Sequence, residues 1–189
     1  AYERASVKKD DSAIAVKKID DIPRYYTETG KAAAAVSGAS GAKLELLGDI
    51  KGNWKISKAS AEFDLGGFAA DADDEGTYLF NLLRSDMKFQ NGYILAYDNQ
   101  TAISAERGTV TLGSDLYIDA GRTGVELSEG ASLIVDGAQI RGTDEAVNLL
   151  GGGSQLIVKS GVFKGYVKIS EGSTAELSEL VRRFRDEVS

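Results

Sequence analysis

The segments VELSEGASLIV (residues 125–135) and VKISEGSTAEL (residues 167–177) are variants of one motif, and they begin 42 residues apart. Each holds a short run in which apolar and polar residues alternate, then a Ser-Glu-Gly turn, then a second short apolar run. Alternation with a period of two is typical of β-strands. An intermediate copy lies at 147–158, and a more distant one, WKISKASAEFDL, lies at 54–65. The chain is therefore built on an internal repeat.

The period of this repeat predicts the fold. Apolar triplets begin at Met87, Val110, Leu133 and Leu156, each 23 residues after the last, and a fifth begins at Ala175 after a shorter step of 19. Each unit holds about three short strands separated by Gly-rich turns. In a parallel β-helix every unit forms one rung, and each strand pairs with its equivalents about 4.8 Å above and below. An antiparallel sandwich or barrel is the competing fold, but it would not keep the same turn chemistry at multiples of one period.

We therefore predict an all-β chain, a single-stranded parallel β-helix of about six rungs over residues 42–177, with short helical caps at both ends. The apolar residues of the strands should stack in inward columns, and the Ser-Glu-Gly segments should form corners in which Gly takes a positive φ. Trp54 and Ile56 should also face inward, and residues 66–76 should form an irregular insertion. The inward positions of the repeats are Val125, Leu127, Leu133, Val135, Val147, Leu149, Leu156, Val158, Val167, Ile169, Ala175 and Leu177.

Stacked rungs leave an open apolar edge at each end, so caps are expected. Residues 178–189 continue a stripe that begins at Leu177 with apolar residues at helical spacing (Leu180, Val181, Phe184 and Val188), which predicts a capping helix. Residues 1–41 form an N-terminal arm. In it, DDSAIAVKKIDDIP predicts a short amphipathic helix that ends at the single proline, Pro23, and KAAAAVSGASGA predicts a linker. This arm either caps the first rung or docks onto another molecule.

Composition excludes several classes of function. The 22 Lys and Arg residues against 29 Asp and Glu give a net charge of −7, which repels a phosphate backbone, so no nucleic-acid partner is expected. No apolar run approaches the roughly 18 residues of a membrane-spanning helix, and the start AYERASVKKDD lacks the apolar core of a secretory signal. Without Cys or His, the chain has no thiolate or imidazole metal ligand and no Ser-His or Cys nucleophile. We expect no cofactor.

Two groups of acidic residues are candidate sites. The segment DADDEG (71–76) matches the first half of a calcium loop, but Leu82 stands where the bidentate acid belongs, which favours a solvated acidic loop. Glu106 and Glu129, 23 residues apart, are expected to stack at a corner, close to the carboxylate spacing of retaining glycosidases. Gly152 interrupts that column on the next rung, so we interpret them as a solvated turn. No catalytic residue and no metal ligand is assigned.

Some outward positions carry apolar or aromatic residues. Ile134 and Ile157 should point outward in one column, with Thr111 and Glu176 at its ends, and we expect this column to be covered by the arm or by another subunit. A one-residue slip of register would exchange the two faces and is the alternative. Tyr25 and Tyr26 of the arm are assigned to the same partner interface. Tyr93, Tyr97 and Tyr117 lie in adjacent rungs, where core packing and a sugar-stacking platform both fit the pattern.

The repeats GTVTLGSDLYIDAG, GASLIVDGAQIRG and GSQLIVKSGVFKG resemble the right-handed parallel β-helix proteins: pectate-lyase-like folds, bacteriophage tailspikes and appendages, and bacterial surface passengers. The resemblance covers residues 42–177 and concerns architecture, because no catalytic signature of these families is present. Phage appendages, which the chain resembles further, have an N-terminal particle-binding segment and no signal peptide, and often form trimers. The resemblance therefore implies a homo-oligomer, with a trimer as one form, and a location on a virion or an extracellular surface.

Two hypotheses about function follow. The preferred one is a non-enzymatic structural or attachment protein, a virion appendage, tail or capsid-associated component, in which the N-terminal arm anchors a rigid β-helix to protein partners. The alternative is a carbohydrate-binding or carbohydrate-cleaving protein of the same fold, of the polysaccharide lyase or glycosidase type, with a glycan as its ligand.

Overall fold

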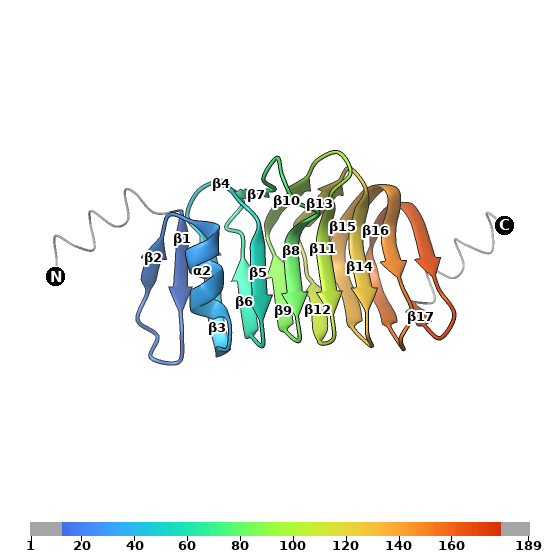
Figure 1. Ribbon diagram of the computed structural model, residues 1–189, viewed down its shortest axis with the longest axis horizontal. Coiled ribbons are helices and arrows are strands. Elements are labelled where there is room, and N and C mark those ends of the chain that lie inside the picture. Colours follow the sequence, from blue (N-terminus) through green and yellow to red (C-terminus); the bar gives the residue numbers. More distant parts are fainter. Residues whose placement is uncertain (1–12, 179–189) are drawn as a thin grey trace.

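The computed structural model describes residues 13–178, and Figure 1 shows them as a row of strands stacked along one long axis. The chain forms a parallel β-helix of about six turns with a period of about 23 residues. Within it, each strand pairs in parallel with its equivalents one turn before and one turn after. The predicted fold class is confirmed.

Strands of successive turns align on three faces, named face 1, face 2 and face 3 in the order in which the chain passes through them. Face 1 holds β3 (Ser40–Leu46), β6 (Ser60–Asp64), β9 (Asp86–Gln90), β12 (Thr109–Leu112) and β17 (Thr174–Leu177). Face 2 holds β4 (Ile50–Lys51), β7 (Ala69–Asp71), β10 (Gly92–Ala96) and β13 (Leu116–Ala120). Face 3 holds β5 (Trp54–Ser57), β8 (Tyr78–Leu83), β11 (Thr101–Glu106) and β14 (Thr123–Ser128). Two long strands, β15 (Ser132–Leu149) and β16 (Gln155–Ile169), run through all three faces in turn.

The register of the strands confirms the columns expected from the repeat. On face 1 the five apolar triplets start in one column, which consists of Met87, Val110, Leu133, Leu156 and Ala175. On face 3 the first residues of the quoted motifs also share a column, which consists of Trp54, Phe80, Ile103, Val125, Val147 and Val167. Residues that lie one period apart in the sequence are therefore neighbours along the long axis of the coil.

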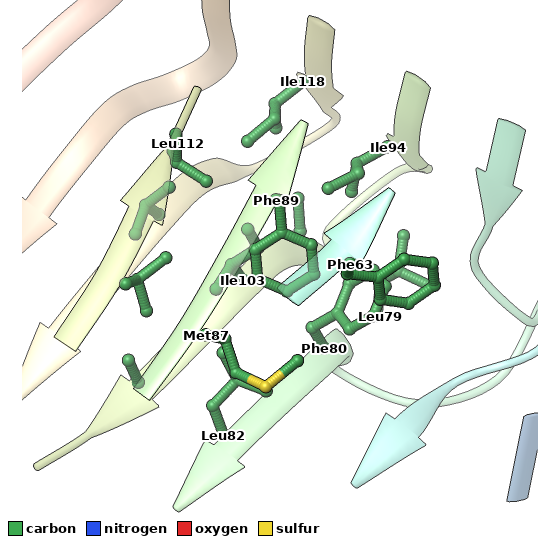
Figure 2. Packing of buried hydrophobic residues seen from close by; sticks show 14 of the residues in the cluster. Phe63, Leu79, Phe80, Leu82, Met87, Phe89, Ile94, Ile103, Leu112 and Ile118 are labelled. Atoms are coloured by element: carbon green, nitrogen blue, oxygen red, sulfur yellow. The ribbon is translucent and has the colours of Figure 1, made fainter. Parts of the chain in front are cut away.

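The inward columns form one hydrophobic core, shown in part in Figure 2. Its inward residues are almost entirely buried through most of the coil, and Val147 and Leu149 have exposed fractions of 0%. One turn later the equivalent residues Val167 and Ile169 are 38% and 42% exposed. The core therefore opens at its C-terminal end within the described residues. The predicted capping helix at 178–189 lies, apart from Ser178, outside the described residues.

The corners between face 3 and face 1 contain a feature that the sequence did not predict. Gly130 has the expected positive φ, but the residue before it, Glu129, also has a φ of 52°. Lys58, Arg84 and Arg107 take φ values of 52°, 51° and 56° at the equivalent corners. The left-handed conformation costs a non-glycine residue about 1–2 kcal/mol. The path of the coil, and not the residue type, imposes this conformation.

The predicted helix before Pro23 is wrong. Ile14–Lys17 form the strand β1, which pairs antiparallel with both β3 and β2 (Arg24–Tyr26). Ile14 and Val16 face the core and are 0% and 1% exposed. Residues 14–17 form a strand because β3, the first strand of face 1, has a free edge with unpaired backbone groups, and β1 pairs with that edge.

The predicted linker is also wrong, because its alanines belong to the helix α2 (Thr29–Val36). This helix packs on β5 and β1 and covers the N-terminal opening of the coil, where Figure 1 shows it. Ala33 and Val36 are 2% and 0% exposed, and the Thr29 hydroxyl donates a hydrogen bond to the carbonyl oxygen of Asn53 at 2.9 Å. Alanine has the highest helix propensity and its small side chain permits close approach, so the run favours a helix as soon as a surface is present to bury it.

The predicted irregular insertion at 66–76 contains a regular element, β7, which pairs with β4 and β10. Only the residues around this short strand form turns and loops.

Candidate functional site

Two tyrosines project from face 2 because alternation in β10 and β13 places them there. Ile94 and Ile118 point into the core, with exposed fractions of 0% and 2%, so Tyr93 and Tyr117 point outward. Gly92 supports this register, because a Cβ atom at this position would lie 2.4 Å from the Cβ of Leu65. Close packing at Gly92 keeps the start of β10 against the core, and this leaves the side chain of Tyr93 exposed to solvent.

The two tyrosine rings form a stacked pair on the surface. Tyr93 and Tyr117 are partners in the register of β10 and β13, and their ring centroids are 5.4 Å apart with an interplanar angle of 18°. Their exposed fractions are 45% and 40%. Each ring covers one side of the other, which leaves ring edges, hydroxyl groups and outer ring faces for a ligand. Of the two interpretations that the sequence left open for these residues, core packing is therefore wrong.

An open groove of about 220 Å³ lies between the tyrosine column and the next outward column of face 2. The tyrosine column continues into Gln139, and the second column consists of Leu95, Asp119, Arg141 and Lys164. Nη1 of Arg141 donates a hydrogen bond to Oδ1 of Asp119 at 2.6 Å, and both side chains are half exposed. The groove thus combines aromatic surface, an amide, two hydroxyl groups and charged groups, which is the lining of a site for a polar ligand.

Two further hollows, of about 300 and 240 Å³, lie on face 1 on either side of the outward column Lys43, Glu62 and Lys88. They are larger than the groove on face 2, but neither is lined by an aromatic side chain. Charges of opposite sign alternate along the column between them. A solvated, self-neutralising surface explains such alternation, so size alone does not make these hollows the better site.

The residues assigned to a partner interface occupy two separate places on face 1. Ile134 and Ile157 share an outward column with Thr111 and Glu176, as predicted, and both isoleucines are half-buried. Strands β1, β3, β6, β9 and β12 separate β2 from β15, so Tyr25 and Tyr26 lie roughly 29 Å away.

The two tyrosines of β2 differ in their environment. Tyr26 pairs with the inward Ile14 and packs against the core, whereas Tyr25 pairs with Ala15. One compact interface therefore does not include the isoleucines together with these tyrosines.

Glu106 and Glu129 are not stacked. Glu106 pairs with Ser128, because the repeat from β11 to β14 has 22 residues instead of 23. Glu129 lies one position further on, in the left-handed corner. The column predicted for these two carboxylates is wrong, and the geometry of a glycosidase pair is not formed by them.

The acidic loop that follows β7 is held by neighbouring turns. The side-chain amide of Asn53 accepts a hydrogen bond from the backbone N–H of Asp73 and donates one to the carbonyl oxygen of Glu75. Lys51 Nζ lies 2.8 Å from Oδ1 of Asp74. Within residues 13–178, no group of three or more acidic side chains is placed to hold a metal ion.

One carboxyl group on face 3 has a perturbed environment. Glu126 stands outward and half-buried between Ser104 and Asn148 on the neighbouring turns. Burial raises the pKa of the Glu126 carboxyl; the Arg122 guanidinium acts against this shift, and the nearby Glu145 carboxylate adds to it. Glu126 is a single acid with no second carboxylate in its own column, so we assign it no catalytic role.

Sequence reasoning missed the polar half of the groove on face 2. Asp119, Gln139, Arg141 and Lys164 were not singled out, because each stands alone among charged residues of ordinary spacing. The signal was available in the period: Arg141 follows Asp119 by 22 residues and Lys164 follows Arg141 by 23, which places them in one column. Alternation along AQIRG and GVFKG would then have pointed them outward.

The class of protein that this geometry defines is a parallel β-helix with an aromatic, charged groove on one face. Comparisons with protein-family models, with curated proteins and with solved structures found no match to this chain. Within the described part of the chain, no helix is long and apolar enough to cross a membrane. Support for a function therefore comes from the site itself.

Proposed function

We propose that this chain is a non-enzymatic attachment protein, in which a rigid β-helix presents a carbohydrate-binding groove on face 2 while protein partners of a virion or cell-surface assembly hold its N-terminal end. The observation that carries the proposal is the exposed Tyr93–Tyr117 stack beside the groove. Two stacked, exposed aromatic rings beside a groove form a contiguous apolar surface of the kind that marks binding sites.

A carbohydrate fits the chemistry of this groove. The C–H groups of a sugar ring pack on aromatic rings, while its hydroxyl groups need the donors and acceptors that the tyrosine hydroxyls, Gln139 and the Asp119–Arg141 pair supply. The turns repeat at about 4.8 Å, so a groove along the axis offers similar contacts to successive units of a chain ligand.

The N-terminal end offers a surface for the protein partner. The loop between β1 and β2 exposes Ile19 and Ile22 by 85% and 57%. The loop is held in shape because the guanidinium of Arg24 donates two hydrogen bonds to the Asp20 carboxylate, whose Oδ1 also accepts the backbone N–H of Ile22. Two aliphatic side chains on an ordered loop form a suitable anchor.

Binding to a glycan array, followed by titration of the best ligand, tests the groove. Tyr117→Ala should weaken binding by about five-fold or more, because truncated tyrosines at binding sites commonly cost more than 1 kcal/mol. Tyr97→Ala is the matched control, since Tyr97 is 49% exposed and does not line the groove. Absence of any glycan binding, or equal loss in both variants, would contradict the proposal.

The anchor needs a test by substitution, because deletion of residues 1–41 would remove β1 and α2 from the core. The double variant Ile19→Asp, Ile22→Asp should keep the thermal stability and glycan binding of the parent chain. It should appear in the soluble fraction when particles or surface structures that carry the protein are isolated. A variant that stays bound to those structures would remove the loop from the anchor.

A further inference from the structure

The groove on face 2 has a distinct charge at one end. Asp119, Arg141 and Lys164 occupy one outward column on three successive turns. Within the described residues, the Arg141 guanidinium makes one side-chain hydrogen bond, through Nη1 to Asp119, and Lys164 makes no ion pair. The remaining donors of Arg141 and the Lys164 ammonium are therefore available to a ligand.

The sign of this lining differs from that of the other hollows. Two cations and one carboxylate line the groove on face 2, a balance of +1. Two lysines and two carboxylates line the larger hollow on face 1, and two lysines and three carboxylates line its neighbour. Of the three hollows described, only the one that contains the tyrosine pair carries an excess of positive charge, although the whole chain has a net charge of −7. This local reversal favours a ligand with negative groups.

The spacing along the axis sets the size of the ligand. Lys164 lies two turns beyond Asp119, roughly 10 Å along the axis, and Tyr93 lies one turn before Tyr117. A ligand that contacts both tyrosines and both cations therefore spans about four turns. A single sugar is too short, whereas an extended oligosaccharide reaches from the aromatic end to the cationic end.

We propose that the groove binds an extended oligosaccharide that carries carboxylate groups, with the sugar rings on Tyr93 and Tyr117 and a carboxylate at Arg141 and Lys164. This inference rests on the proposed carbohydrate-binding function and names its ligand class. A carboxylate is planar, so its two oxygens can accept hydrogen bonds from the free N–H groups of the planar Arg141 guanidinium. Its single negative charge also suits the Lys164 ammonium on the next turn.

The full chain is titrated at low salt with tetrasaccharides of uronic acids, with the methyl esters of the same tetrasaccharides, and with sulfated tetrasaccharides that contain no uronic acid. The acids should bind about five-fold more tightly than their esters, and high salt should remove this difference. Equal binding of acid and ester would overturn the inference while leaving carbohydrate binding intact. Tighter binding of the sulfated sugars would overturn the carboxylate assignment. No binding of any sugar would refute the proposed function as well.

Two lysine variants locate the charge effect. Lys164→Gln should weaken binding of the acid about three- to five-fold and leave binding of the ester unchanged, since an exposed ion pair contributes at most about 1 kcal/mol. Lys168→Gln is the control, because Lys168 lies on the same strand and points outward from face 3, so it changes the net charge equally. Equal effects of the two substitutions would show that net charge, and not this end of the groove, attracts the ligand.

Discussion

Replacement of Phe80 by Ala tests the aromatic cluster at the N-terminal half of the core, part of which Figure 2 shows. Phe80 is 0% exposed and contacts three other rings. Its centroid lies 5.5 Å from that of Trp54 in a stacked arrangement, and 5.8 and 5.0 Å from those of Phe63 and Phe89 in edge-to-face arrangements. Together with Phe80 these rings come from four strands, β5 and β8 of face 3 and β6 and β9 of face 1, so Phe80 joins adjacent turns.

The expected loss follows from these contacts. Truncation of a buried Phe to Ala lowers the free energy of unfolding by about 3–5 kcal/mol, through lost burial and the cavity that remains. Each aromatic pair contributes about 0.5–1.5 kcal/mol beyond its buried area, and Phe80 takes part in three such pairs. The loss for Phe80→Ala should therefore lie at the upper end, about 4–5 kcal/mol.

Urea denaturation measures this loss. The single tryptophan, Trp54, stacks on Phe80 and reports the cluster by fluorescence, while circular dichroism reports the strands of the whole coil. Phe68→Ala is the control, because Phe68 is 37% exposed, and it should lose less than about 1 kcal/mol. A loss below about 2 kcal/mol for Phe80→Ala, or one equal to that of the control, would refute the role assigned to the cluster.

Three further predictions concern the corners, the cap and pH. Gly108→Ala should lower the free energy of unfolding by about 2 kcal/mol or more in urea titrations, because Gly108 has a φ of 93° and a Cβ would lie 2.3 Å from the Ser85 carbonyl oxygen. Gly48→Ala is the control and should change this free energy by less than about 1 kcal/mol, because nothing lies within 4 Å of a Cβ there. Val36→Asp should cost about 3 kcal/mol or more by thermal melting, because it places an unpaired charge under the N-terminal cap, and an unchanged melting temperature would mean that α2 does not seal the core. Burial raises the pKa of the Glu126 carboxyl in the folded chain above its ordinary value of 4.5, so this group destabilises the fold increasingly as pH rises from that value through the raised pKa. Glu126→Gln should therefore raise the melting temperature at neutral pH, and the gain should vanish well below pH 4.5, where the carboxyl is protonated in both states.

The repeat made most of the coil predictable, because in a parallel β-helix the residue one period away is also the neighbour in space. The triplets from Met87 to Ala175 could therefore be placed in one column before the structure was known, including the short last step. The same logic failed for Glu106 and Glu129, because the step from β11 to β14 has 22 residues instead of 23 and a one-residue error moves a side chain out of its column.

The N-terminal cap was not predictable in detail. The segment Ile14–Lys17 is so short that its apolar residues fit both helical and strand spacing. It forms a strand because it pairs with the free edge of β3. The alanines of Thr29–Val36 favour a helix, but a segment of eight residues is too short to be a stable helix on its own. The helix forms because it packs over the open N-terminal end of the coil.

The sequence by itself determined the period, the inward columns and the acidic net charge, because these depend only on residue order and composition. The tertiary structure alone decided which of several apolar residues in GYILAY face outward, since both alternating sets are hydrophobic. Burial of Ile94 and Ala96 in the core, together with the close packing of Gly92 on Leu65, leaves Tyr93 outside. The tertiary structure also brought Tyr117, Arg141 and Lys164, which are up to 47 residues apart in sequence, to one groove. The positive end of that groove exists only in the folded coil, because the stacking of successive turns is what places Arg141 and Lys164 side by side.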